Sequence, residues 1–100
     1  MKLLAFAASH RPQSLNYQLV LLAADYAKNL GVEVDVAYYG DFDMPIYNDI
    51  SADNPPAETK KFLERCKNVD GIIIGMPEYN WSFPGSLKNI IDWTSKIDRD

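Results

Sequence analysis

The sequence has little of the chemistry that metal sites, disulfides and nucleic-acid surfaces require. One cysteine and one histidine occur in 100 residues, which excludes an internal disulfide and a Cys/His zinc cluster. The formal net charge is −4, which argues against a basic surface for nucleic acid or acidic lipid. We therefore expect a protein of a reducing, cytoplasmic compartment that binds neither nucleic acid nor a membrane.

Long hydrophobic runs are also absent. No run approaches the ~20 apolar residues of a membrane span. The apolar residues 3–8 follow Lys2 as in a secretory signal, but the run is shorter than the roughly 7–15 residues of a signal core. With 47% apolar and 24% charged residues, the sequence is typical of one small globular domain.

Glycine and acidic residues are missing from the start of the chain. No glycine precedes Gly31, which excludes both a Walker loop and a G-x-G-x-x-G fingerprint there. No Asp or Glu occurs in residues 1–24, although the chain is acidic overall, and the charged residues of this segment are Lys2 and Arg11. A segment of this kind favours a bound anion.

Apolar patterns predict strands and helices in alternation. Continuous apolar runs at residues 2–8 and 69–76 predict strands buried on both faces, and alternation over residues 32–38 predicts a strand near a sheet edge. Helices are expected after each strand, the second over residues 57–68 and the third from residue 87 toward residue 97. The buried face of the first helix is expected to comprise Leu19, Leu22, Ala23, Tyr26, Ala27 and Leu30.

This β-α-β-α-β-α order predicts an α/β fold with a doubly wound parallel sheet. In the flavodoxin-like strand order 2-1-3, the first strand lies between the other two, and ligands bind at the carboxyl ends of the first and third strands. The polar loops 9–16 and 77–85 follow these two strands. We therefore expect the two loops to lie side by side at a ligand crevice.

The first loop reads SHRPQSLN and suits an anion. A helix start offers unpaired backbone N–H groups, and Arg11 adds a fork that binds phosphate in a bidentate manner. A simpler interpretation remains open, in which Ser14 or Asn16 only caps the helix and Arg11 is a surface charge. His10 is either a surface residue or, less commonly, a base.

The second loop reads PEYNWSFPG and places Tyr79, Trp81 and Phe83 at alternate positions. Such side chains form the walls of a site for a flat ligand, although they equally suit helix packing or a subunit interface. A phosphate loop beside aromatic walls indicates a phosphorylated flat cofactor, for which FMN is the candidate in this strand order.

Three segments then show a resemblance to a known family. SHRPQSLN resembles the S-x-R-x-x-S-x-N phosphate loop of the NAD(P)H-dependent FMN reductases, although Ala8 replaces the usual glycine before it. MPIYND resembles the L-P-x-Y-N-x-D segment of that family, and PEYNWSFPGSLKNIIDW is similar to its most specific motif. The resemblance covers residues 1–100 as the N-terminal part of a flavodoxin-like FMN-binding domain, without its last two strands.

The resemblance implies FMN as the cofactor and a set of residues around it. Those around the FMN phosphate would be Ser9, Arg11, Ser14, Leu15 and Asn16. Those along the ribityl chain and the isoalloxazine edge would be Pro77, Glu78, Tyr79 and Asn80, largely through backbone groups, with Ser82 and Phe83 as neighbours. No catalytic acid, base or metal ligand is predicted, because the flavin carries the redox chemistry.

The implied activity is the transfer of two electrons from NAD(P)H through FMN to free flavin, quinone, azo or similar acceptors, in a ping-pong scheme. A homodimer or homotetramer is also implied. Two alternatives stay open from the sequence. One is a one-electron carrier of the flavodoxin type, whose phosphate loop is usually richer in Thr and Gly. The other is a non-catalytic, truncated fragment or interaction module that binds no cofactor.

Overall fold

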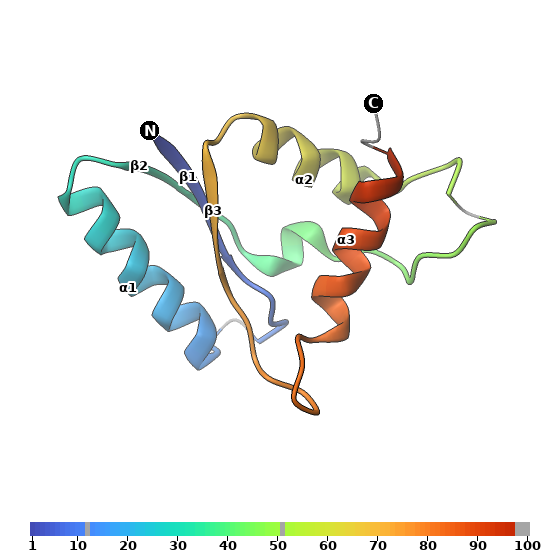
Figure 1. The fold of residues 1–100 in the computed structure, drawn as a ribbon, viewed down its shortest axis with the longest axis horizontal. Coiled ribbons are helices and arrows are strands. Elements are labelled where there is room, and N and C mark those ends of the chain that lie inside the picture. The colour runs from blue at the N-terminus through green and yellow to red at the C-terminus, as the bar shows by residue number, and fades with distance from the viewer. Residues whose placement is uncertain (12, 51, 98–100) are drawn as a thin grey trace.

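The computed structural model describes residues 1–11, 13–50 and 52–97 (Figure 1). Its elements in chain order are β1 (Lys2–Ala7), α1 (Leu15–Asn29), β2 (Glu33–Val36), a 3₁₀ helix (Tyr39–Phe42), α2 (Ala57–Lys67), β3 (Gly71–Gly75) and α3 (Gly85–Ile97). No helix in this described part has the length and apolar character needed to cross a membrane.

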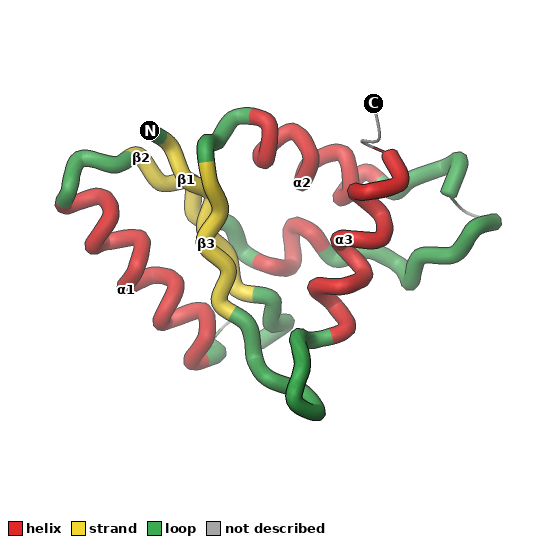
Figure 2. The backbone as a smooth tube through the Cα atoms, in the orientation of Figure 1, coloured by secondary structure: helices red, strands yellow, loops and turns green. Residues whose placement is uncertain are grey.

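The three strands form one parallel sheet in the order β2-β1-β3, as the sequence predicted. Figure 2 shows α1 on one side of the sheet and α2 and α3 on the other. The three helices occur where they were expected, and the strands are shorter than the apolar runs that predicted them. The fold is a three-layer, flavodoxin-like α/β arrangement.

The larger core lies between the sheet and the pair α2 and α3. Phe6 of β1 packs edge-on against Phe42 and Phe62, with ring centroids 5.6 and 5.7 Å away. Trp93 of α3 is fully buried in the same cluster, and its indole N–H donates to the carbonyl of Pro45 at 2.8 Å. The long loop after the 3₁₀ helix is thereby attached to α3.

The core on the other side of the sheet is small and consists of short side chains. Ala5 and Ala7 of β1 pack against Val20 of α1. The buried side chains of α1 are Val20 and Ala24. The predicted buried face of α1 is therefore wrong, since its large members are exposed, namely Leu19, Leu22, Tyr26 and Leu30. Small residues face the sheet because α1 approaches it too closely for leucine side chains.

The expectation that β3 is buried on both faces is also wrong. Ile72 is 44% exposed and Ile74 is 36% exposed, while Ile73 packs against the core beneath α1. β3 is an edge of the three-stranded sheet, and its side chains are only partly covered. A continuous apolar sequence thus predicted the strand correctly but not its environment.

Gly75 determines how closely α1 approaches β3. A Cβ atom at Gly75 would lie 2.6 Å from Cγ2 of Val20 and 3.0 Å from the backbone oxygen of Asn16. We expect Gly75→Ala to lower the free energy of unfolding by about 1–2 kcal/mol. Alanine is less free than glycine in the unfolded chain, which favours folding, but the cost of overpacking against Val20 and Asn16 is larger. Gly85→Ala is the matched control, since nothing lies within 4 Å of its Cβ position. Equal urea midpoints for the two variants would contradict the close approach.

Asp35 and Arg65 form a bidentate ion pair between β2 and α2. The Nε and Nη2 groups of Arg65 donate to the two carboxylate oxygens of Asp35 at 2.9 and 2.6 Å. The guanidinium also lies 3.6 Å from Asp41 and over the ring of Phe42. The hydrogen bonds from Arg65 hold the pKa of Asp35 below its ordinary value.

This pair gives stability a defined dependence on pH. Because the folded-state pKa of Asp35 is lowered, its contribution is present above its unfolded pKa of about 4 and is lost as the pH falls through the folded pKa. Asp35→Asn is expected to cost roughly 1 kcal/mol at pH 6 and less at pH 3, measured by urea unfolding. The control is Glu33→Gln, which changes an exposed carboxylate and should leave the free energy of unfolding unchanged at both pH values. If Asp35→Asn lowered the free energy of unfolding equally at both pH values, the ionised carboxylate of Asp35 would not be the source of this stability.

Candidate functional site

The two predicted loops start at neighbouring strand ends on the same edge of the sheet. The backbone N–H of Ala8 donates to the carbonyl of Gly75 at 2.7 Å, which joins the ends of β1 and β3. Figure 1 shows the loop after β1, the start of α1 and the loop after β3 together at the lower end of the sheet. The predicted convergence of loops 9–16 and 77–85 is therefore observed.

Ser14 is the N-cap of α1. Its side-chain oxygen accepts from the backbone N–H of Tyr17 at 3.0 Å, and its carbonyl accepts from that of Gln18. The capping interpretation of Ser14 is thus correct. Capping leaves the helix start intact as a place where backbone N–H groups and the helix dipole favour an anion.

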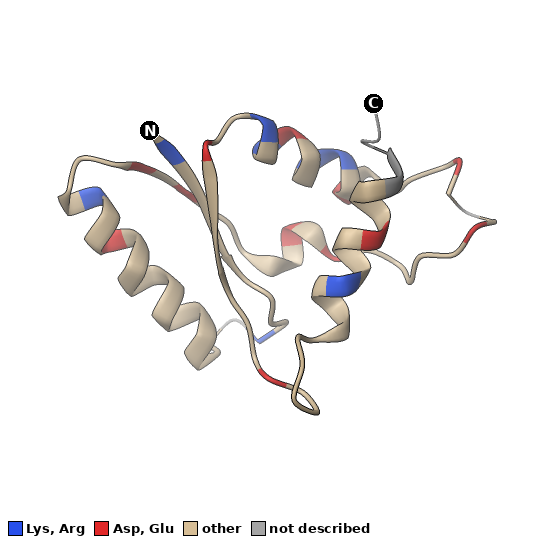
Figure 3. Cartoon of the chain, viewed as in Figure 1, with Lys and Arg blue, Asp and Glu red and all other residues tan. Residues whose placement is uncertain are grey.

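The neighbouring residues of this loop are accessible to a ligand. Ser9 and Asn16 are half-buried, and Arg11 and Leu15 are exposed. Arg11 has no ion pair with any other residue in the described ranges, so its guanidinium is available. Figure 3 shows that the first turns of α1 carry no charged residue and that no acidic residue lies in the adjoining loop. The local electrostatics therefore favour an anion.

The second loop contains a tight turn that the sequence did not predict. Tyr79 and Ser82 exchange two backbone hydrogen bonds of 3.1 Å around Asn80 and Trp81. Both central residues have positive φ, 53° and 67°, which is strained for a tryptophan. The carboxylate of Glu78 supports the turn by accepting from the backbone N–H of Trp81 at 3.2 Å.

The aromatic side chains of this loop point into solvent rather than into the core. Trp81 is 95% exposed, and Tyr79 and Phe83 are about half exposed. Pro77 is half-buried, and Glu78, Asn80 and Ser82 are exposed. Packing on a neighbouring helix, one of the two alternatives for Trp81, is excluded within the described part of the chain. A ligand wall or a contact with another polypeptide remains.

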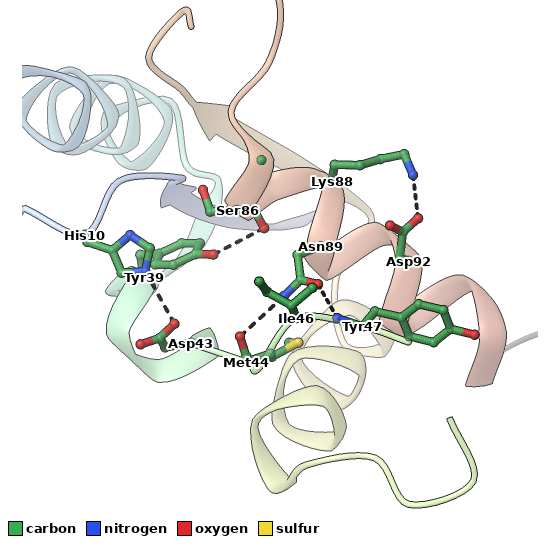
Figure 4. Close-up of a pocket in the computed structure, with 11 residues that line it drawn as sticks. His10, Tyr39, Asp43, Met44, Ile46, Tyr47, Ser86, Lys88, Asn89 and Asp92 are labelled. Carbon is green, nitrogen blue, oxygen red and sulfur yellow. Dashed lines mark hydrogen bonds and ion pairs between the residues drawn. The ribbon is translucent and has the colours of Figure 1, made fainter. Parts of the chain in front are cut away.

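A cavity of about 510 Å³ lies beside these loops, on the side of α3 (Figure 4). Its walls include His10, Tyr39, Asp43, Met44 and Ile46. None of the residues predicted to contact FMN lines it. Besides His10, most of its residues lie in the segments MPIYND and PEYNWSFPGSLKNIIDW, which carried the family resemblance. Its residues come from three separate segments, and no local spacing indicates that they meet.

The polar groups of this cavity are mostly paired with one another. His10 Nε2 lies 3.3 Å from a carboxylate oxygen of Asp43, and the Tyr39 hydroxyl donates to the carbonyl of Ser86 at 3.2 Å. Burial raises the pKa of Tyr39, and the hydrogen bond to Ser86 opposes this shift. Asn89 fixes the loop below by accepting from the N–H of Tyr47. These contacts order the walls of the cavity. Because its polar groups are mostly paired, the two loops remain the candidate site for the flavin.

The comparison with protein families gives one match over the whole chain. The model described as NADPH-dependent FMN reductase matches residues 1–100. A 2-hydroxy-1,4-benzoquinone reductase from Burkholderia sp is 32% identical over 96 residues, which are 96% of this chain and 51% of that protein. A quinone reductase from Escherichia coli K12 is 42% identical over 57 residues, which are 55% of this chain and 30% of that protein.

Solved structures agree with this match. FerB from Paracoccus denitrificans, a flavoenzyme NAD(P)H:(acceptor) oxidoreductase, superposes with a TM-score of 0.78 at 29% identity, over 94% of this chain and 50% of its own. The azoreductase AzrA has a TM-score of 0.68 at 18% identity, over 94% of this chain and 55% of its own, which supports the fold alone. The chain spans about half the length of these proteins.

Proposed function

This chain belongs to the NADPH-dependent FMN reductase family, and we propose that its two loops bind FMN for electron transfer from NAD(P)H to a quinone. The observation that carries the proposal is the strand order β2-β1-β3, which puts the start of α1 and the turn at Tyr79–Ser82 at one edge of the sheet. Ligands of doubly wound sheets bind at such an edge.

The residues present fit FMN at its phosphate end. Arg11 is exposed and unpaired within the described ranges, and Ser9 and Asn16 lie on either side of the Ser14 cap. We propose that these side chains and the first amides of α1 hold the phosphate. No carboxylate of the loop opposes the two phosphate charges.

The second loop fits the flat part of the cofactor. We propose that Pro77, Glu78, Tyr79 and Asn80 line the ribityl chain and the ring edge through backbone groups, with Ser82 and Phe83 nearby. The strained turn at Asn80 and Trp81 supports this, because residues held in sparsely populated conformations cluster at ligand sites. When bound, FMN accepts electrons from a nicotinamide and passes them to an acceptor, and the protein orients it.

We propose a quinone as the acceptor, and a cytoplasmic dimer or tetramer as the working form. The Burkholderia and E. coli relatives are named quinone reductases, which supports the acceptor class. The test is the visible absorption of the purified protein, followed by NADPH and NADH oxidation with benzoquinone, with and without added FMN. Flavin absorption without turnover would favour a one-electron carrier, and no flavin binding would favour an interaction module.

The Tyr79 hydroxyl is expected to contribute little to cofactor affinity. The side chain of Tyr79 is 58% exposed, and the contact that we propose for this residue is made by its backbone rather than by its hydroxyl. Tyr79→Phe should therefore change FMN affinity less than threefold, or about 0.6 kcal/mol, in a fluorescence titration. A loss above about 2 kcal/mol would show that the hydroxyl itself is buried against the flavin.

A further inference from the structure

The cavity of about 510 Å³ between the loop after the 3₁₀ helix and the start of α3 has no part in the proposed flavin contacts (Figure 4). Its volume lies within the range of about 300–1,000 Å³ that is usual for small-molecule sites. His10, in its wall, belongs to the loop after β1, and Gly85, also in its wall, ends the loop after β3. The cavity therefore adjoins both loops that we propose for the flavin.

The charged side chains of the cavity wall lie in pairs of opposite sign. His10 Nε2 is 3.3 Å from a carboxylate oxygen of Asp43. At the other end of the cavity, Lys88 Nζ donates to the carboxylate of Asp92 at 2.6 Å, one turn along α3 (Figure 4). Because neither sign of charge dominates, the cavity suits an uncharged ligand better than an ion.

Much of the remaining wall is apolar or aromatic. The ring of Tyr39 packs edge-on against that of His10, with centroids 4.7 Å apart, and this contact fixes both rings. Met44 is buried beside them, whereas Ile46 is 84% exposed, so its side chain is free to contact a ligand. Ring and aliphatic walls of this kind bind flat, apolar rings.

Two polar groups of the wall remain available to such a ring. The hydroxyl of Ser86 makes no hydrogen bond within the described residues, and it can donate as well as accept. The Nδ1 atom of His10 is also without a partner there, since the contact with Asp43 uses Nε2. The cavity thus offers a few hydrogen-bonding groups among apolar walls, which suits a flat, uncharged ring that carries oxygen atoms.

We propose that this cavity binds the quinone acceptor, with the ring against Tyr39 and Ile46 and a quinone oxygen at Ser86 or His10. A quinone is a flat, uncharged ring with oxygen atoms at its rim, as these walls require. The identification of the ligand as a quinone rests on the proposed function. The cavity itself is part of this chain, so its binding can be measured without a flavin.

The experiment titrates the chain, without flavin, with duroquinone and follows proton NMR spectra. Duroquinone has no free ring position for addition of the Cys66 thiol. His10 is the only histidine of the chain, so its imidazole signals are identified at once. These signals and the methyl signal of Met44 are expected to shift until the site is saturated. The methyl signal of Met76, which lies outside the cavity wall, should not shift.

Two exposed isoleucines provide matched variants that leave the core intact. Ile46→Lys removes an apolar contact and adds a charge at the cavity, so it should weaken duroquinone binding at least about fivefold. Ile50→Lys is the control, because Ile50 is 95% exposed and lies outside the wall. With FMN and NADPH present, Ile46→Lys should raise the KM for duroquinone and leave the KM for NADPH unchanged.

Three results would overturn the proposal. One is a duroquinone titration that leaves the His10 and Met44 signals in place or moves that of Met76 instead. Another is equal duroquinone affinity for Ile46→Lys and Ile50→Lys. The third is a dimer, by light scattering, that Ile46→Lys alone dissociates, since a second copy would then fill the cavity.

The outcome for the cavity is separable from that for the proposed function. Saturable binding of duroquinone at His10 without NADPH oxidation would support the cavity site and contradict the reductase activity. Turnover of duroquinone with an unchanged KM in Ile46→Lys would support the activity and contradict the cavity site.

Discussion

Replacing Trp93 with alanine is expected to lower the free energy of unfolding by about 3–5 kcal/mol, the range for a large buried aromatic. The indole is 1% exposed and packs edge-on against Tyr47, with ring centroids 5.1 Å apart. Its N–H also donates to the carbonyl of Pro45. Since whole domains are stable by about 5–15 kcal/mol, this one change removes much of the total.

The other tryptophan provides the control for this prediction. Trp81 is 95% exposed, so Trp81→Ala should change stability by no more than about 0.5 kcal/mol. Urea unfolding followed by circular dichroism measures both variants. A cost below about 1 kcal/mol for Trp93→Ala would mean that α3 does not pack on the loop as described.

Replacing Arg11 with alanine is expected to weaken FMN binding about tenfold or more. A charge-assisted, bidentate hydrogen bond contributes roughly 1.5–3 kcal/mol, and no other cation lies in the acid-free loop. Arg11→Lys keeps the positive charge but loses the planar guanidinium. Its affinity for FMN should therefore lie between that of the unchanged chain and that of Arg11→Ala. Fluorescence titration measures the affinities, and an unchanged value for Arg11→Ala would remove Arg11 from the site.

Riboflavin separates a phosphate contact from a general effect on the site. It lacks the phosphate, so Arg11→Ala should leave riboflavin affinity unchanged while FMN affinity falls. An equal loss for both ligands would show that Arg11 supports the loop rather than binding the phosphate.

The sheet and its helices were predictable because each element has a strong local signal. The apolar run that contains β1 and the run GIIIG of β3 are strands in almost any context, and Gly31 follows the end of α1. Alternation of these elements fixes a parallel sheet. The strand order then followed from the polar loops after the first and third strands. These loops can form one ligand site only if the two strands are neighbours.

The burial of α1 was not predictable from the same pattern. A line of leucines on a helix marks a surface to be packed, but not which neighbour packs it. The sheet-facing side is instead set by Gly75, which admits Val20 and Asn16 at close range and leaves no room for larger side chains. Leu19, Leu22 and Tyr26 were consequently assigned to the side that faces the sheet, whereas they are exposed.

The candidate site was predictable in its loops but not in its details. Ser14 and Arg11 stand out because they follow a buried strand in a segment without acids. The turn at Asn80 and Trp81 has no glycine to indicate its positive φ, and Asn80, a residue type enriched in this conformation, is its one local signal. The cavity beside Tyr39 depends on contacts between residues 47 positions apart, such as the one to Ser86.

The most direct test of the proposed phosphate site is a titration of this chain with FMN and with riboflavin. The account holds that the loop from Ser9 to Asn16 binds the phosphate. FMN should therefore bind at least about tenfold more tightly than riboflavin, as expected for one charge-assisted contact. Equal affinities for the two flavins, or no binding of either, would contradict the account.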